Sequence, residues 1–252
     1  MKIKLFNEYK WRLQRKQETN VWSEVTIRIL AVVLALVIFG ITIRLNNMSV
    51  ISSAKEVIKG TLGNSYGIQQ LFILATPIMM TGLAYVLGSR MQLFNTGVEG
   101  QFFVGALTAT SVGLYIKGNP ILVLALMFIA GAIGGALLAF IPALLRSYAN
   151  VNEILTTLML NFVAILLVQH FAIGVWHDPG MKRATAKIIY ELPTIFGSSV
   201  HVGIVIAILI AIIITLTLRG TRWGYELTTI GGNQKAAEYS GMPVKRNLLL
   251  VL

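Results

Sequence analysis

Long apolar runs with few charges dominate this sequence and leave little choice of fold. A helix needs about 20 mostly apolar residues to cross the hydrocarbon core of a bilayer. Six stretches qualify: Val25–Ile43, Gln70–Leu87, Val98–Ile116, Ile121–Leu145, Ile154–Trp176 and Val202–Leu218. They are too long, and alternate too poorly, to be the strands of a membrane barrel. The sequence therefore predicts an all-α fold, a polytopic transmembrane helical bundle of about six complete spans, with the start of a seventh at Asn247.

The charge content supports this prediction. Only 12% of the residues are charged, against about 25% in a soluble domain, so most of the surface must face lipid or partner proteins. The chain has no cysteine, which excludes disulfides and thiolate chemistry. Its three histidines are scattered, and we expect no metal site, no catalytic residue and no cofactor.

The basic residues predict an orientation. If the N-terminus is cytoplasmic and the six spans alternate, roughly twice as many Lys and Arg residues face the cytoplasm as face the outside. Residues 1–24 then form a cytoplasmic basic arm, residues 25–252 form the membrane domain, and residues 219–246 form a cytoplasmic segment between two spans. The net charge of +11 is spread over several loops, so we expect no nucleic-acid binding.

Small residues at helical spacing predict close helix packing. Gly131 and Gly135 form one small-xxx-small step, and Gly105 and Ala109 form another. Such steps let two helix backbones approach each other in lipid.

A first polar cluster lies between two spans, where Asn95, Glu99 and Gln101 fall within about two helical turns. A carboxylate at membrane depth is costly, which predicts that Glu99 faces protein or water, in the packing or in a solute pathway. Alternatively, the stretch is a cytoplasmic turn and Glu99 is an early residue of the next helix, where the helix dipole favours an acid.

A second polar cluster begins at Asn152, which is suited to cap the following span, with Glu153 in its first turn. Thr157 and Asn161 are four residues apart and share a helix face. Asn161 lies well inside the span and needs a partner there. An interhelical hydrogen bond and a contact to solute are the two interpretations.

A third polar stretch, Gly231–Gly241 (GGNQKAAEYSG), lies in the basic segment. Ala236, Ala237 and Glu238 favour a helix, and Gly241 followed by Pro243 is a stop signal. The pattern predicts a short helix with small residues on its surface. It is either a solvated loop helix or a surface on which another protein docks.

Three motifs together resemble a known family. They are Leu93–Gln101 (LFNTGVEGQ), Asn152–Asn161 (NEILTTLMLN), and GYEL from Gly224 followed by the Gly231–Gly241 stretch. In order and spacing they are similar to the permease subunits of bacterial ATP-binding-cassette importers in the branched-chain amino acid, ribose and nucleoside branch. The resemblance is closest to the nucleoside permeases that depend on a basic membrane lipoprotein.

The resemblance implies a multi-pass plasma-membrane subunit that moves a nucleoside or related small polar solute and is not itself an enzyme. A cytoplasmic ATPase, a second permease subunit and an extracellular solute-binding lipoprotein would be its partners. The residues of the ATPase-coupling segment would be Gly231, Asn233, Lys235, Ala236, Ala237, Glu238 and Gly241. Family members continue past the coupling segment, so the chain also resembles a C-terminally truncated permease.

Two alternatives stay open. One keeps the mechanism and changes the solute to a simple sugar or a branched-chain amino acid. The other is a secondary carrier or channel without an ATPase, which predicts charged residues lining the spans and no docking segment. The spans here hold few acids and bases, which favours the importer.

Overall fold

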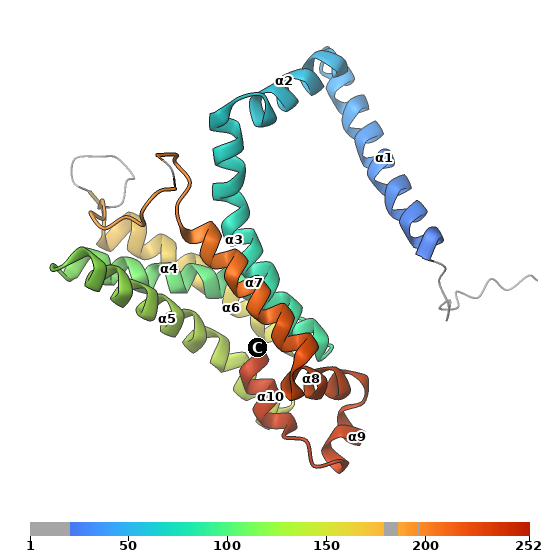
Figure 1. Ribbon diagram of the computed structural model, residues 1–252, viewed down its shortest axis with the longest axis vertical. Helices are drawn as coiled ribbons and strands as arrows, with labels where there is room; N and C mark the ends of the chain where they lie inside the picture. The colour runs from blue at the N-terminus through green and yellow to red at the C-terminus, as the bar shows by residue number, and fades with distance from the viewer. Residues whose placement is uncertain (1–20, 179–185, 196) are drawn as a thin grey trace, which may run out of the picture. The chain divides into compact units, whose positions relative to one another are not determined.

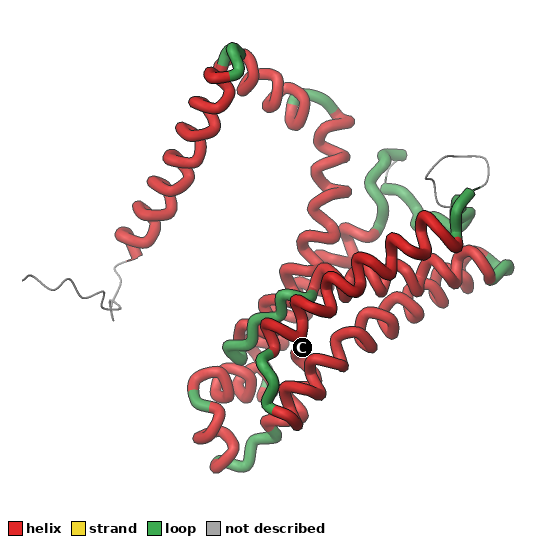
Figure 2. The backbone as a smooth tube through the Cα atoms, turned by 180° about the vertical axis from the view of Figure 1, so that it is seen from behind, coloured by secondary structure: helices red, strands yellow, loops and turns green. Residues whose placement is uncertain are grey.

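The computed structural model describes residues 21–178, 186–195 and 197–252. In these ranges the chain consists of helices joined by loops, with one isolated antiparallel bridge between Thr194 and His201 (Figures 1 and 2). The predicted all-α fold is confirmed. The chain divides into two units, Met1–Asn64 and Ser65–Leu252, and most of the predicted basic arm lies outside the described residues.

The first unit holds two helices. α1 (Val21–Leu45) is apolar on all sides and long enough to span a membrane, as predicted. α2 (Val50–Leu62) was not predicted as a helix. It is short and amphipathic, and it carries Lys55 and Lys59 one turn apart on its polar face. The hydroxyl of Ser49 caps its first turn by accepting a hydrogen bond from the Ser52 amide.

The second unit begins with long helices. They are α3 (Ser65–Arg90), α4 (Val98–Tyr115), α5 (Pro120–Ala149), α6 (Glu153–Gln169), which a π-helical turn η1 (His170–Val175) extends, and α7 (Gly203–Gly220). α4 packs against both α5 and α6, and α7 packs against α3. Three short helices follow: α8 (Arg222–Gly232), α9 (Gln234–Tyr239) and α10 (Val244–Val251).

Five described helices, α1, α3, α5, α6 with η1, and α7, are long and apolar enough to cross a membrane, which is one fewer than predicted. The exception is α4, whose 18 residues include several Gly, Ser and Thr. It nevertheless runs from one side of the unit to the other. Asn95, just before it, bonds to Leu252 after α10, and Tyr115 at its end bonds to Trp176 in the opposite loops. Within this unit α4 therefore connects the two ends between which the other long helices run.

The predicted small-residue steps pack against each other. A Cβ on Gly105 would lie 2.9 Å from the carbonyl oxygen of Gly131, and one on Gly131 would lie 3.5 Å from the Cβ of Ala109. The hydroxyl of Thr108 also donates to the carbonyl of Ala130, at 2.9 Å. The backbones of α4 and α5 are thus in near contact, as the spacing predicts.

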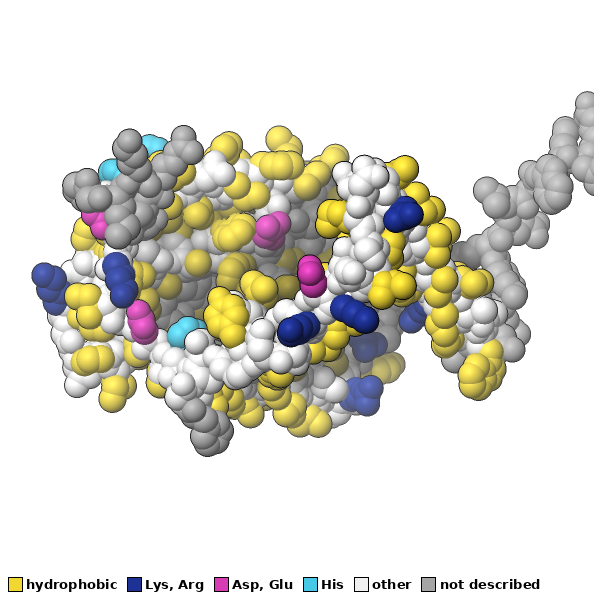
Figure 3. Space-filling view, turned by 90° about the horizontal axis from the view of Figure 1, so that it is seen from above, with side chains coloured by type: hydrophobic (Ala, Val, Ile, Leu, Met, Phe, Trp, Pro, Cys, Tyr) yellow, Lys and Arg dark blue, Asp and Glu magenta, His cyan; other side chains and the backbone are white. Residues whose placement is uncertain are grey.

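The short helices α8–α10 form a compact cap over one end of the long helices. Its buried core includes Leu227, Ile230, Ala237, Val244 and Leu248, packed against residues that follow α3. By contrast, large apolar side chains are exposed along the long helices, and Figure 3 shows apolar patches interspersed with polar and charged groups. An apolar exterior of this kind belongs in lipid or against partner proteins.

Candidate functional site

A non-helical segment, Met91–Gly97, connects α3 to α4 and lies against protein. Its residues alternate between buried and exposed positions. Met91 and Leu93 enter the core of the cap, and their amides donate to the carbonyl of Gly88 at the end of α3. Irregular backbone is tolerated beside a membrane only where protein or water satisfies its polar groups. Here the end of α3 and nearby side chains satisfy these polar groups.

Asn95 organises this segment. It is buried, and its Oδ1 accepts the amide of Gly97 at 3.0 Å. Its Nδ2 donates to the carbonyl of Leu252 at 3.0 Å and faces the Oε1 of Gln101 at 3.3 Å. The predicted cluster of Asn95 and Gln101 therefore exists, and it joins the start of α4 to the end of α10.

The second cluster meets the first. The amide of Thr96 donates to the Oγ1 of Thr157 at 3.2 Å, and the two threonine hydroxyls are 2.9 Å apart. Gly97 is next, and a Cβ there would lie 2.7 Å from the carbonyl oxygen of Thr157. One turn on, a Cβ on Gly100 would lie 2.7 Å from the Oδ1 of Asn161. The glycines of this motif thus serve a close contact between α4 and α6.

The side-chain oxygen of Asn161 does not make the hydrogen bond expected of this residue. Its side chain is buried, and its Oδ1 has no hydrogen-bond partner in the described part of the chain. Asn161 contacts Gly100 through close van der Waals packing. Of the two sequence-based interpretations, the interhelical hydrogen bond is therefore not found for this oxygen.

Glu99 lies in the first turn of α4, as the helix-start interpretation requires. Its side chain is exposed on this chain, so the expected shielding is not provided by the chain itself. The helix rotates Glu99 away from the face that Gly97 and Gly100 turn toward α6.

The start of α6 matches the prediction. The side chain of Asn152 caps the helix by accepting the amide of Ile154 at 2.9 Å. Glu153 in the first turn is buried and pairs with Arg146 of α5 at 3.3 Å. The sequence did not predict the pairing with Arg146. The end of α5 returns onto the start of α6 through a left-handed turn at Asn150, whose φ is 53°, and the sequence alone does not show this turn.

The predicted short helix is confirmed as α9. The Oδ1 of Asn233 caps it by accepting the amide of Ala236 at 3.1 Å. Gly241 follows it with a φ of +78°, a conformation that favours glycine. A capped start and a glycine stop explain why a helix of six residues forms here.

Two residues predicted for the ATPase-coupling segment pack against the protein instead of facing outward. Ala237 is 0% exposed and belongs to the core of the cap. Gly231 is pressed against the backbone of Arg90 and Met91 at the end of α3, in a space that a Cβ would fill. The expectation that both alanines lie on the outer face is wrong for Ala237, because one side of even a short helix must pack on the cap.

The outer face of α9 consists of Lys235, Ala236, Glu238 and Tyr239, all exposed. Tyr239 is 92% exposed, and it was not among the predicted residues. Its signal was available, since an aromatic residue beside a polar helix of small residues is typical of a contact surface.

A buried polar link on α8 and α10 was also missed. The side chain of Asn247 accepts from the Nε1 of Trp223 at 3.0 Å and donates to Glu226 at 3.1 Å. Trp223 and Glu226 are three residues apart on α8 and so face the same partner.

Among the residues that the structure describes, no three His, Cys, Asp or Glu side chains lie close enough together to hold a metal ion.

Comparison with known proteins agrees with these features. A guanosine transporter permease of Bacillus subtilis is 30% identical over 233 residues, which cover 90% of this chain and 67% of the relative. A glucose transporter permease of Haloferax volcanii is 30% identical over 245 residues, covering 92% and 64%. A nucleoside transporter permease of Lactococcus lactis is 25% identical over 244 residues, covering 92% and 67%. No solved structure matches significantly.

The chain thus spans about two thirds of the length of these relatives. A family model described as a branched-chain amino acid transport system permease component matches residues 67–252. That range contains the polar segment before α4, its contact with α6 and the α8–α10 cap. The chain is a multi-pass membrane protein that belongs to this permease family.

Proposed function

We propose that this chain is the membrane-spanning subunit of an ATP-binding-cassette importer and that α9 couples it to a cytoplasmic ATPase. The observation that carries the proposal is that α9 has one buried side and one exposed side. One side, Ala237, is fixed in the core of the cap. The other side, from Lys235 to Tyr239, is exposed and connected through the cap to the ends of the long helices.

Such an arrangement suits transmission of movement. α8 contacts α3 backbone to backbone at Gly231, and α10 is linked to α8 through Asn247. A force on α9 would therefore move the ends of several helices as a body, because packed interfaces shift between discrete arrangements and do not deform continuously. ATP hydrolysis belongs to the separate subunit in this proposal.

The proposed solute is a nucleoside. It is supported by the guanosine and nucleoside permeases among the relatives. A sugar is the second candidate, because relatives from Haloferax volcanii and Bifidobacterium longum are glucose and fructose permeases. An extracellular solute-binding lipoprotein and a second permease subunit complete the proposed transporter.

We also propose a plasma-membrane location in a bacterium, with a cytoplasmic N-terminus and α8–α10 on the same side. The distribution of Lys and Arg supports this orientation. It puts the loop between η1 and α7 outside, where a solute-binding protein would dock.

The test is uptake by cells that express the transporter with its ATPase and lipoprotein. Radiolabelled guanosine should accumulate, and unlabelled uridine or adenosine should compete for uptake while glucose and fructose do not. Competition by a sugar and not by a nucleoside would transfer the proposal to the sugar class. Uptake that persists unchanged after deletion of the ATPase gene would refute the importer mechanism altogether.

A further inference from the structure

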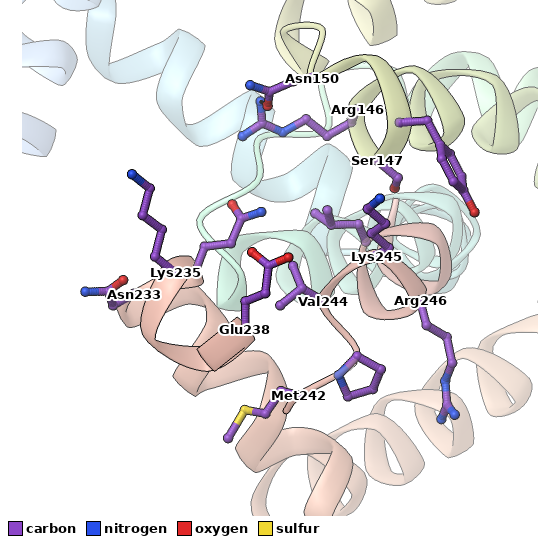
Figure 4. Close-up of a pocket in the computed structure, with 14 residues that line it drawn as sticks. Arg146, Ser147, Asn150, Asn233, Lys235, Glu238, Met242, Val244, Lys245 and Arg246 are labelled. Atoms are coloured by element: carbon purple, nitrogen blue, oxygen red, sulfur yellow. Dashed lines mark hydrogen bonds between the residues drawn. The ribbon is translucent and has the colours of Figure 1, made fainter. Parts of the chain in front are cut away.

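A cleft of about 860 Å³ is lined by the end of α5, by α9 and by the start of α10 (Figure 4). Most of the charged residues in its lining are basic. Arg146 comes from α5, Lys235 from α9, and Lys245 and Arg246 from α10, whereas Glu238 is its one lining carboxylate. This excess of positive charge favours an anionic occupant.

Ser147 gives an independent sign of a ligand. It lines the cleft, its side chain is only 9% exposed, and its Oγ has no hydrogen-bond partner in the described part of the chain. Figure 4 shows the hydroxyl pointing from α5 toward the α10 side of the cleft, where Lys245 lies. A buried hydroxyl without a partner is unfavourable, and an acceptor in the cleft would satisfy it.

The basic side chains of the cleft differ in how many contacts they already make with other protein groups. Arg146 pairs with Glu153 at 3.3 Å and donates to Asn150 at 3.2 Å. Lys245 is exposed, and its Nζ is 5.4 Å from the centre of the Tyr148 ring, a contact that leaves its three N–H donors largely available. Lys235 is exposed on the opposite wall.

The level of the cleft indicates the source of the anion. Arg146, Ser147 and Tyr148 lie in the last turn of α5, a helix long and apolar enough to cross a membrane. The cleft is therefore at the membrane surface, and Tyr148 is exposed there, as aromatic residues at headgroup level are. Basic pockets between helices at this depth suit anionic headgroups.

We propose that this cleft binds the phosphate of an anionic phospholipid, with the Ser147 hydroxyl donating to a phosphate oxygen and Lys245 and Lys235 balancing its charge. Glu238 opposes the anion and sets how tightly it is held. The site shares Lys235 and Glu238 with the proposed ATPase surface, so lipid retention is measured on the protein without the ATPase.

The test uses the purified protein in detergent with phosphatidylglycerol and phosphatidylcholine, and native mass spectrometry counts the retained lipid. The wild type should retain phosphatidylglycerol in preference. Ser147→Ala and Lys245→Gln should each lower that retention about fivefold, and Glu238→Gln should raise it. Arg219→Gln is the matched control, since it removes the same charge from an exposed side chain at the end of α7 that does not line the cleft.

Folding does not confuse the result, because Ser147→Ala removes a hydroxyl that has no partner, and its melting temperature should not fall. Equal retention in the wild type, Ser147→Ala and Lys245→Gln proteins would overturn the site. Displacement of the lipid by millimolar inorganic phosphate would show that free phosphate is the ligand and overturn the lipid assignment. So would a Lys245→Gln protein that keeps its lipid but loses the ATPase, since the cleft would then receive an acidic protein segment.

Discussion

Asn247 donates a hydrogen bond from its side-chain amide to Glu226 across 3.1 Å, and this pair joins α10 to α8. Asn247 is 0% exposed, and its amide oxygen simultaneously accepts from Trp223. The amide nitrogen and the amide oxygen of this one buried side chain thus both bond to α8. The arrangement fixes the orientation of α10 in the cap.

Replacing Asn247 by Leu should therefore destabilise the cap. The indole N–H of Trp223 and an oxygen of Glu226 would be left without this partner, and each such loss costs about 1–3 kcal/mol. Thermal unfolding of the purified protein should show a lower melting temperature. Arg222→Gln is the control, because the Arg222 side chain that pairs with Glu226 is 92% exposed and exposed ion pairs contribute little. Equal shifts for both variants would contradict the role of Asn247.

Two neighbouring glycines offer a matched pair in α8. A Cβ at Gly231 would collide with the carbonyl of Arg90, whereas one at Gly232 would meet nothing within 4 Å. Gly231→Ala should cost about 1–3 kcal/mol through overpacking. Gly232→Ala should be neutral or slightly stabilising, because alanine is the better helix former. Denaturation of the two purified variants, compared side by side, measures the difference, and similar stabilities would show that α8 is not held against α3.

The contact between α4 and α5 can be tested in the same way. Gly105→Val would push a side chain into the backbone of Gly131, whereas Gly82→Val in α3 meets open space. We expect Gly105→Val to lower both the melting temperature and the amount of protein in the membrane. Gly82→Val should affect neither in the isolated chain. The measurement is fluorescence-detected size exclusion of membrane extracts over a temperature series.

The long elements were predictable because lipid imposes a simple rule on them. Each span is a long apolar run, and the helix ends at Asn152 and Gly241 carry ordinary cap and stop residues. α2 was missed because 13 mixed residues are too short and too polar for a span. α4 was counted as a span on its length and position, and hydropathy does not show that the segment before it, Met91–Gly97, is non-helical and lies against protein.

The motifs singled out several polar residues that meet in the structure, but they did not predict the contacts between them. Thr96 and Thr157 belong to two of the motifs that the sequence shows, yet only the fold places their hydroxyl oxygens 2.9 Å apart. Burial of Ala237 could not be foreseen, because the two adjacent alanines are chemically identical and their difference is set by which side of α9 packs on the cap. The Arg146–Glu153 pair depends in the same way on a chain reversal.

The orientation can be checked with single cysteines, since the chain has none. Lys187 and Ser240 are both exposed, and they lie on opposite sides of the membrane in the proposed orientation. In intact cells an impermeant maleimide should label Lys187→Cys and not Ser240→Cys. After permeabilisation both should react, which controls for accessibility. Labelling of Ser240→Cys alone in intact cells would reverse the proposed topology.

The coupling proposal makes its sharpest prediction at the two adjacent alanines of α9. Ala236 is exposed and Ala237 is fully buried. A glutamate at either position adds the same charge and volume to the same helix. Only at Ala236 can that side chain reach a partner protein while leaving the cap intact.

Ala236→Glu should therefore reach the membrane with an unchanged melting temperature and lose the ATPase. Ala237→Glu should instead be depleted from the membrane, because a buried carboxylate without a partner is strongly destabilising. Overpacking at a protein contact costs about 1–3 kcal/mol, so co-purification of the ATPase with Ala236→Glu should fall about tenfold or more. Ser240→Ala serves as the control: it removes only a hydroxyl that bonds within the helix to the carbonyl of Ala236. Undiminished ATPase binding by the stable Ala236→Glu protein would show that α9 is a solvated helix, and the coupling surface would have to be sought elsewhere on the cap.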